Sequence, residues 1–436
     1  MQQRKHSARP SRQRRTKTPS QIVKRAASQD VQRQRVKKQH IKNLNRRQKP
    51  LSISKQKPPN PRFKILSLAV RKATRERWAG MAEETQRIVL GDGKYVEERC
   101  VPVASSFAQP HTQGPLVDSS ANQGPQALSS TQIAHDIFAQ VQLCRQGTTF
   151  YPHYSPTLAN WANPPRQTSD ATRAATAIDF MHCSTLTAAR RLSSTMSDPN
   201  SGSSNSSIGV MSFASPKKPG GGYLHGGNEQ EETIARLSSL VASLSSPAAQ
   251  DFYKEHKKYR AEDGSGLHDH SIVYSPGVSV FRADVDDDNE IPAEDAVGGA
   301  FIPPYNINVL SAVPVNAAAV RSKHVILPAE QQFFADGIRG AMKERMARAL
   351  RVFEERGDRI IVLGAFGCGS SENKVETIAA IWAELLVCED DEGRNRFHNV
   401  FERVVFAVPG KLYEPFKRAF EMRLFESQVS EAVSTD

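Results

Sequence analysis

The sequence predicts a layered α/β domain in the second half of the chain. From residue 178 onward, short apolar runs typical of buried strands alternate with amphipathic segments typical of helices. Glycine-rich loops follow two of the apolar runs directly, at the strand ends where such sheets bind ligands. The first 64 residues differ in composition and are expected to lie outside this domain.

The predicted elements follow one another in a regular order. Residues 66–90 have the mixed apolar and charged pattern of a helix, whereas residues 100–176, rich in Ser, Gln, Pro and Thr, are expected to form long ordered loops or partial disorder. Apolar runs predict strands at 208–214, near 272, and at 307–313, 360–364 and 403–408. Helical periodicity predicts helices at 185–192, 231–244, 337–355, 374–387 and 412–425.

The first glycine loop joins the strand at 208–214 to the helix at 231–244. Three consecutive glycines, Gly220 to Gly222, allow positive φ and leave backbone N–H groups unshielded, so this loop can wrap a diphosphate. Glu231 and Glu232 stand at the start of the following helix, where they project about 100° apart and cannot do the same job. A carboxylate pair at a helix start also commonly serves only to stabilise the helix dipole.

The second glycine loop, from Gly364 to Gly369, follows the strand at 360–364. It fits the first half of a phosphate-binding P-loop, but Ser370 stands where that motif requires Lys. We therefore do not expect a nucleoside triphosphatase.

Together these segments resemble the microbial-type poly(ADP-ribose) glycohydrolases, which have a macrodomain fold. The resemblance rests on residues 213–224 with Gln230–Glu232 and on the second glycine loop at 361–369. Shorter matching segments occur in the order of the family, at residues 178–180, 188–192, 273–276, 280–282 and 403–408.

The resemblance implies a macrodomain-like, three-layer α/β/α fold with a mixed sheet and an N-terminal helical extension, and the composition of the first 64 residues adds a disordered basic tail. The expected regions are a tail at 1–64, a helical and loop-rich accessory region at 65–176, the catalytic domain at 177–425 and a C-terminal tail at 426–436.

The resemblance also implies the chemistry, which is cleavage of the ribose–ribose bond in ADP-ribose polymers without metal or cofactor. Glu232 is the expected acid/base, whose pKa must be raised by burial, and Glu231 the partner that holds the ribose hydroxyls. The other expected ligand-binding residues are Gly220, Gly221, Gly222, Gln230, Gly364, Phe366, Gly367, Cys368, Gly369, Ser370 and Ser371.

Two departures from the family leave alternatives open. Ser371 stands where the family commonly has an aromatic residue that packs on the distal ribose, and Lys218 where it commonly has Asn. A catalytically weak ADP-ribose-binding module is one alternative, and a hydrolase of another ADP-ribose linkage is the other. The preference for chain ends or interior, the adenine contacts and the linkage are not predicted.

The charge of the chain is unevenly distributed. Residues 1–64 carry a net charge of +20 against +12 for the whole chain, which leaves −8 for the rest. This tail has too little apolar surface to fold alone, and its cations suit nucleic acid, poly(ADP-ribose) or an import receptor. Basic clusters at 37–38 and 46–49 resemble a split nuclear-import signal. We expect a nuclear or cytoplasmic location in preference to a mitochondrial one.

Other features narrow the class of protein. No apolar run reaches the roughly 18 residues that span a bilayer, so no membrane association is expected. Five cysteines without paired CxxC spacing argue against a disulfide framework or a structural zinc site. His268–His270 and Asp286–Asp288 are interpreted as solvated loops instead of metal sites, and the protein is expected to be a monomer.

Overall fold

The computed structural model describes residues 61–102, 128–163, 174–196, 207–262, 264–285, 298–388 and 396–434. Residues 68–436 belong to one compact unit. The predicted basic tail, except for its last four residues, and the acidic run at 286–288 lie outside the described residues. The expectations for these segments therefore stay predictions.

A mixed seven-stranded sheet forms the centre of the unit, in the order β3-β6-β7-β5-β8-β9-β4. Five neighbouring strands, from β7 to β4, run parallel, while β6 runs antiparallel to both β7 and β3. The strands are β3 (Thr149–Tyr151), β4 (Ala177–Met181), β5 (Ile208–Phe213), β6 (Ile272–Arg282), β7 (Phe301–Ala312), β8 (Ile360–Leu363) and β9 (Arg403–Ala407).

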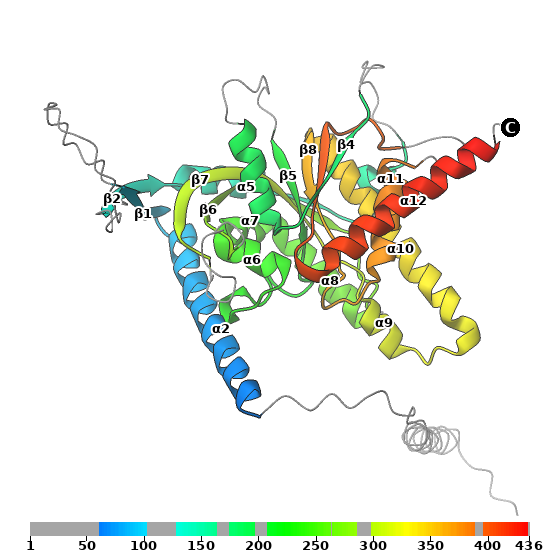
Figure 1. Cartoon of the computed structure of the whole chain (residues 1–436), viewed down its shortest axis with the longest axis horizontal. Helices are drawn as coiled ribbons and strands as arrows, with labels where there is room; N and C mark the ends of the chain where they lie inside the picture. The colour runs from blue at the N-terminus through cyan, green and yellow to red at the C-terminus, as the bar shows by residue number, and fades with distance from the viewer. Residues whose placement is uncertain are drawn as a thin grey trace, which may run out of the picture. The chain divides into compact units, whose positions relative to one another are not determined.

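Helices cover both faces of this sheet, which confirms the predicted three-layer α/β/α architecture (Figure 1). One face packs against α4 (Pro156–Ala159), α10 (Gln331–Arg356), α11 (Val375–Leu386) and α12 (Tyr413–Ser434). The other face packs against α5 (Thr185–Met196), α6 (Gln230–Leu237), α7 (Leu240–Leu244) and α8 (Pro247–Glu262).

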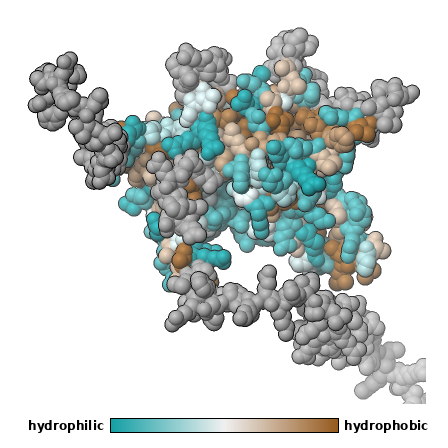
Figure 2. Space-filling view, viewed as in Figure 1, coloured by the Kyte–Doolittle hydropathy of each residue, from teal (hydrophilic) through white to brown (hydrophobic). Residues whose placement is uncertain are grey.

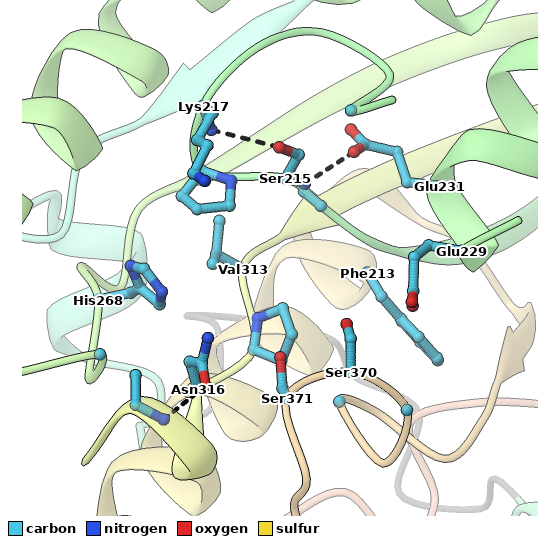
Figure 3. A pocket seen from close by; sticks show the side chains of 18 of the residues that line it. Phe213, Ser215, Lys217, Glu229, Glu231, His268, Val313, Asn316, Ser370 and Ser371 are labelled. Atoms are coloured by element: carbon cyan, nitrogen blue, oxygen red, sulfur yellow. Dashed lines mark hydrogen bonds between the residues drawn. The ribbon is translucent and has the colours of Figure 1, made fainter. Parts of the chain in front are cut away.

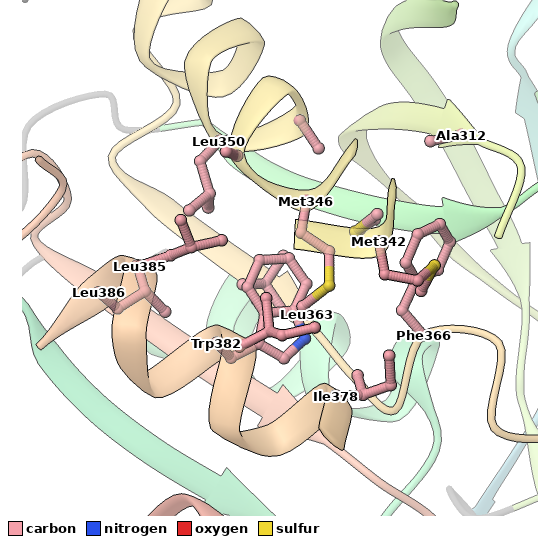
Figure 4. Close-up of a cluster of buried hydrophobic side chains, with 14 of the residues drawn as sticks. Ala312, Met342, Met346, Leu350, Leu363, Phe366, Ile378, Trp382, Leu385 and Leu386 are labelled. Carbon is pink, nitrogen blue, oxygen red and sulfur yellow. The ribbon is translucent and has the colours of Figure 1, made fainter. Parts of the chain in front are cut away.

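Side chains that alternate along the strands pack against the helices of both layers. In β8, Ile361 and Leu363 join the first core and Ile360 and Val362 join the second, because successive side chains of a strand point to opposite faces. Trp382 of α11 lies at the centre of the first core, which Figure 4 shows. Its indole N–H donates to the carbonyl of Gly364 at 3.1 Å, so the core also positions the second glycine loop.

The N-terminal helix α2 (Pro61–Leu90) precedes a two-stranded antiparallel sheet of β1 (Lys94–Pro102) and β2 (Leu128–Asp136), followed by α3 (Phe138–Gly147). The helix is anchored by Arg282 at the end of β6. The guanidinium of Arg282 donates to Thr85 at 2.9 Å and to Glu84 at 2.5 Å. The helix predicted at 66–90 is therefore confirmed and packs directly on the α/β unit.

Three sequence expectations need correction in this part of the chain. Residues 128–159, expected as loops or partial disorder, form regular elements, and β3 is an edge strand of the main sheet. The helix predicted at 231–244 is broken, because Ser238 is extended and Ser239 exchanges backbone and hydroxyl hydrogen bonds with Ser279 of β6. Residues 426–434, expected as a tail, continue α12 because no Gly or Pro interrupts them.

The segment His268–His270 is also not the solvated loop that was expected. Asp269 is buried, accepts a hydrogen bond from the Ser271 N–H at 2.6 Å and pairs with His153 at 2.8 Å. Sequence alone missed this because the partner His153 lies more than a hundred positions away.

The surface of the unit is largely hydrophilic on the face that Figure 2 shows, with some apolar strips. One of them lies on α12, where Met422, Phe425 and Val429 are exposed. None of the helices in the described parts of the chain is both long and apolar enough to cross a membrane.

Candidate active site

A cavity of about 560 Å³ lies beyond the carboxyl ends of β5, β7 and β8. Its walls come from the loop after β5, the segment after β7, the end of α8 and the second glycine loop. The carboxyl ends of parallel strands in doubly covered sheets are the usual place for a ligand, and the volume suits a molecule of nucleotide size.

The first glycine loop lines this cavity with Gly221 and Gly222, but not with Gly220. Gly220 and Gly221 have φ of 65° and 54°, a region that favours glycine. A Cβ on Gly220 would lie 2.8 Å from the ring of Tyr223, so only glycine allows the turn to pack on this ring.

Glu232 is held against this loop by two backbone donors. The Gly222 N–H donates to Oε1 at 2.6 Å, and the Glu229 N–H donates to Oε2 at 2.8 Å. Gly227 packs so tightly on the carboxylate that an added Cβ would lie 2.1 Å from Oε2. The side chain lines the cavity in a fixed orientation.

Glu231 lies deeper and is only 2% exposed. Its Oε2 accepts from the Ser215 N–H at 2.7 Å, whereas its Oε1 has no hydrogen-bond partner among the described residues (Figure 3). Burial, assisted by the neighbouring charge of Glu232, raises the pKa of Glu231 to about 8.

The protonation of Glu231 predicts how stability depends on pH. The folded pKa is about 8 and the ordinary value 4.5, so folding retains a proton that the unfolded chain releases between these values. The stability that this one proton contributes is fully present below about pH 4.5. It is lost as the pH rises toward 8, by at most about 1.4 kcal/mol per pH unit. Urea unfolding at pH 5, 6, 7 and 8 should show this slope for the unmodified chain and a flatter one for Glu231→Gln. Equal slopes would contradict the assignment.

Gln230 does not line the cavity, contrary to its predicted role in ligand binding. Its carbonyl oxygen accepts from the Phe213 N–H at 2.8 Å, and its amide donates to the Met211 carbonyl at 2.9 Å and to Thr185 at 3.1 Å. The residue uses its polar atoms to tie the start of α6 to the end of β5. It thereby helps to position the two glutamates that follow it in α6.

The second glycine loop contributes Gly367, Gly369, Ser370 and Ser371 to the cavity wall. Asn373 ties this loop to the segment after β7, because its amide donates to the carbonyls of Val315 at 2.7 Å and Gly367 at 3.0 Å.

Three residues predicted to bind ligand in this loop do not line the cavity: Gly364, Phe366 and Cys368. The Gly364 carbonyl is engaged by Trp382, and Phe366 is buried against Phe213 with ring centroids 5.3 Å apart. Burial raises the pKa of the Cys368 thiol to about 12, so it is not a reactive thiolate. These three residues shape the loop from inside.

Several cavity residues were missed by sequence reasoning. Two of them come from α8, which was not predicted because its charged residues conceal the apolar face formed by Ala249, Phe252, Tyr253 and His256. The missed residues include Phe213, Lys217, Glu229, Tyr259, Arg260, His268 and Asn316. Asn316 could have been recognised as the N-cap of α9 (Ala317–Lys323), because its side chain accepts from the Ala319 N–H at 2.8 Å.

Arg345 of α10 connects two walls of the cavity, the segment after β7 and the segment before β6. Its side chain is fully buried, and its guanidinium donates to the carbonyls of Val313 at 2.8 Å and of Leu267 and His268 at 2.9 Å. His268 has a φ of 60°, so this clamp also holds an unfavourable backbone conformation.

Helix α2 supports the glutamates from the other side, through Arg236. The guanidinium of Arg236 donates to the Gly227 carbonyl at 2.7 Å and lies 4.8 Å from the ring centroid of Trp78. The Arg236 carbonyl accepts from Thr85 at 2.7 Å. Since Gly227 packs on the Glu232 carboxylate, α2 and Arg236 together set the position of this carboxylate.

Loss of the hydrogen bond from Arg236 to Gly227 should lower the rate of a reaction that uses Glu232 more than it weakens ligand binding. We expect Arg236→Met to lower kcat about tenfold, because Gly227 loses its donor and the carboxylate loses its fixed position. The dissociation constant of ADP-ribose, measured by calorimetry, should change less than about threefold, and Arg236→Lys should recover part of kcat. An unchanged kcat in Arg236→Met would show that the contact has no catalytic consequence.

The fold and the site define a macrodomain-like α/β protein with two glycine loops and a glutamate pair in one cavity. The model of the microbial-type PARG catalytic domain, where PARG is poly(ADP-ribose) glycohydrolase, matches residues 121–283. This segment of the chain is therefore similar to the catalytic domain of the microbial-type PARG family, and together with the solved structures the match indicates a hydrolase of that kind.

Solved structures agree with the family match. The chain is 27% identical to PARG from Thermomonospora curvata, with 80% of this chain and 99% of that chain covered and a TM-score of 0.56. For the same enzyme bound to the inhibitor ADP-HPD, identity and coverage are the same and the TM-score is 0.54. PARG from Deinococcus radiodurans in complex with ADP-ribose is 29% identical, with 65% and 96% covered and a TM-score of 0.50. No curated protein matches the chain.

Proposed function

We propose that this protein hydrolyses the ribose–ribose O-glycosidic bond of ADP-ribose polymers and releases ADP-ribose, with Glu232 as the acid/base. The observation that carries the proposal is the convergence of Glu231, Glu232 and both glycine loops on one cavity. The solved relatives include complexes with ADP-ribose and with ADP-HPD, which support a ligand of this chemistry.

The diphosphate of the substrate would lie between the two glycine loops. Gly221 and Gly222 on one side and Gly367, Gly369 and Ser370 on the other are small residues, which let a backbone approach phosphate oxygens closely. This arrangement suits an anion even though residues 65–436 carry a net charge of −8, because the attraction comes from local donors.

The distal ribose would then lie over the glutamates. The unpartnered Oε1 of Glu231 is buried and needs a hydrogen-bond partner, which a ribose hydroxyl supplies. Because burial raises the pKa of Glu231 to about 8, its carboxyl is mostly protonated at neutral pH and can also donate to that ribose.

Glu232 would carry out the chemical steps. It would protonate the oxygen of the departing ribose as an oxocarbenium-like centre develops at the anomeric carbon. Its carboxylate would then take a proton from the attacking water, which returns the carboxyl to its starting state. The bond broken joins the anomeric carbon to the oxygen of the neighbouring unit, and the water oxygen forms the new bond.

A weakly catalytic ADP-ribose-binding module is the second candidate. Ser371 lines the cavity, and its small side chain leaves the distal ribose without the aromatic partner that the family commonly has. A ribose held less firmly spends less time in the reactive orientation, so turnover would fall while binding remains.

Release of ADP-ribose from purified poly(ADP-ribose), followed by chromatography, tests the proposal. The proposal expects catalytic turnover on the polymer and little on O-acetyl-ADP-ribose or mono-ADP-ribosyl esters. Tight ADP-ribose binding in calorimetry without release would favour the binding module. Preferential cleavage of an ester would favour a hydrolase of another linkage.

A further inference from the structure

Exposed cations gather at the mouth of the cavity. Lys217 and Lys218, in the loop after β5, and Arg260, in the last turn of α8, all line the cavity and are exposed. In Figure 3, Lys217 and His268 lie on one side of the cavity, while Glu229 and Glu231 lie on the other. Lys323 lies nearby, since its Nζ is 3.6 Å from where a Cβ on Gly264 would be.

The cationic surface continues outward along α8. Lys257 precedes Arg260 by three residues, which places both on one face of the helix, and it is exposed. Lys254 continues this face by another turn, but it pairs with Asp251 at 2.7 Å. Lys217, Lys218, Lys257 and Arg260 have no acidic partner within ion-pair distance among the described residues, and together they form what we call the cationic rim.

This concentration of charge contrasts with the rest of the unit. Residues 65–436 carry a net charge of −8, so a polyanion is repelled by most of the surface and attracted at the rim. A cavity of about 560 Å³ suits one nucleotide-sized ligand. Further units of a polymer must therefore lie outside it. The unit joined at the scissile bond begins beside Glu232, whereas a unit attached at the adenosine end would lie on the side of the rim.

We propose that the cationic rim binds the diphosphate of a second ADP-ribose unit, the one attached at the adenosine end of the unit held in the cavity. This inference rests on the proposed function, and it adds a preference for polymers over single ADP-ribose units. Flexible, exposed ammonium and guanidinium groups bind phosphates without fixed geometry, so this contact should be strongly weakened by salt. Single-stranded nucleic acid is the competing occupant because it also presents phosphates, although at a different spacing.

The test compares binding of fluorescent poly(ADP-ribose) to Glu232→Gln protein with and without Lys257→Ser and Arg260→Ser. Glu232→Gln prevents cleavage during the measurement. A matched control carries Arg87→Ser and Arg418→Ser, which remove two exposed cations that do not line the cavity. At low salt we expect the rim variant to bind the polymer about tenfold more weakly and the control to differ less than twofold. The slope of log affinity against log salt should become shallower by about two in the rim variant.

Two further measurements test the inference: the affinity for single ADP-ribose and the competition by single-stranded DNA. In the rim variant, affinity for single ADP-ribose should fall at least about threefold less than affinity for the polymer, because Arg260 lines the cavity but Lys257 does not. The inference is overturned by equal loss for monomer and polymer, by no loss for the polymer, or by competition from single-stranded DNA as strong as that from unlabelled polymer. Failure of the proposed function is recognised separately, since unmodified protein would then release no ADP-ribose from the polymer.

Discussion

Glu232→Gln should lower the rate of ADP-ribose release from poly(ADP-ribose) by about a thousandfold, the usual scale for loss of a general acid. The substitution keeps the size of the side chain and leaves an oxygen that can accept from the Gly222 N–H, which now donates to Oε1 at 2.6 Å. The fold and the first glycine loop should therefore persist. Initial rates by chromatography measure the effect.

A neighbouring glutamate provides the control for this prediction. Glu229 also lines the cavity but is exposed, and the proposed mechanism gives it no role. Glu229→Gln should retain activity within about fivefold, and calorimetry should show that both variants bind ADP-ribose. A Glu232→Gln protein with near-normal turnover would remove Glu232 from the mechanism.

Gly227→Ala should lower kcat by about a hundredfold, the cost of moving a reacting group by about 1 Å. A Cβ at this position would lie 2.1 Å from Oε2 of Glu232, far inside van der Waals contact. The carboxylate must then move, and its bonds from Gly222 and Glu229 must stretch or break. Steady-state kinetics on the polymer measure the loss.

Gly340→Ala is the matched control, because a Cβ on this residue of α10 would meet nothing within 4 Å. This change should leave kcat unaltered and stabilise the helix by up to about 1 kcal/mol. If Gly227→Ala turned over as fast as Gly340→Ala, the tight packing around the Glu232 carboxylate would have no bearing on catalysis.

Sequence was most informative where function and local pattern coincide. The triple glycine, the glutamate pair and the second glycine loop are contiguous motifs, and the structure brings parts of all three to one cavity. The alternation of apolar runs and amphipathic segments was enough to predict the layered fold. Family resemblance supplied the roles of Glu231 and Glu232, which remain proposals, as does a nuclear or cytoplasmic location.

Long-range contacts account for most of what sequence reasoning missed. The amide of Gln230 hydrogen-bonds to Phe213 and Met211, more than fifteen positions away, and these contacts cannot be read from the sequence motif. The raised pKa of Glu231 depends on depth in the folded unit, which adjacent residues in sequence do not reveal. The support that Trp78 gives to Arg236 joins two distant helices.

A crystal structure of Glu232→Gln protein with bound ADP-ribose tests the central claim most directly. The account predicts the diphosphate between Gly221–Gly222 and Gly367–Ser370, with a distal ribose hydroxyl within hydrogen-bond distance of Glu231 and the anomeric carbon facing residue 232. ADP-ribose bound with that ribose turned away from both residues, or outside the cavity altogether, would contradict it.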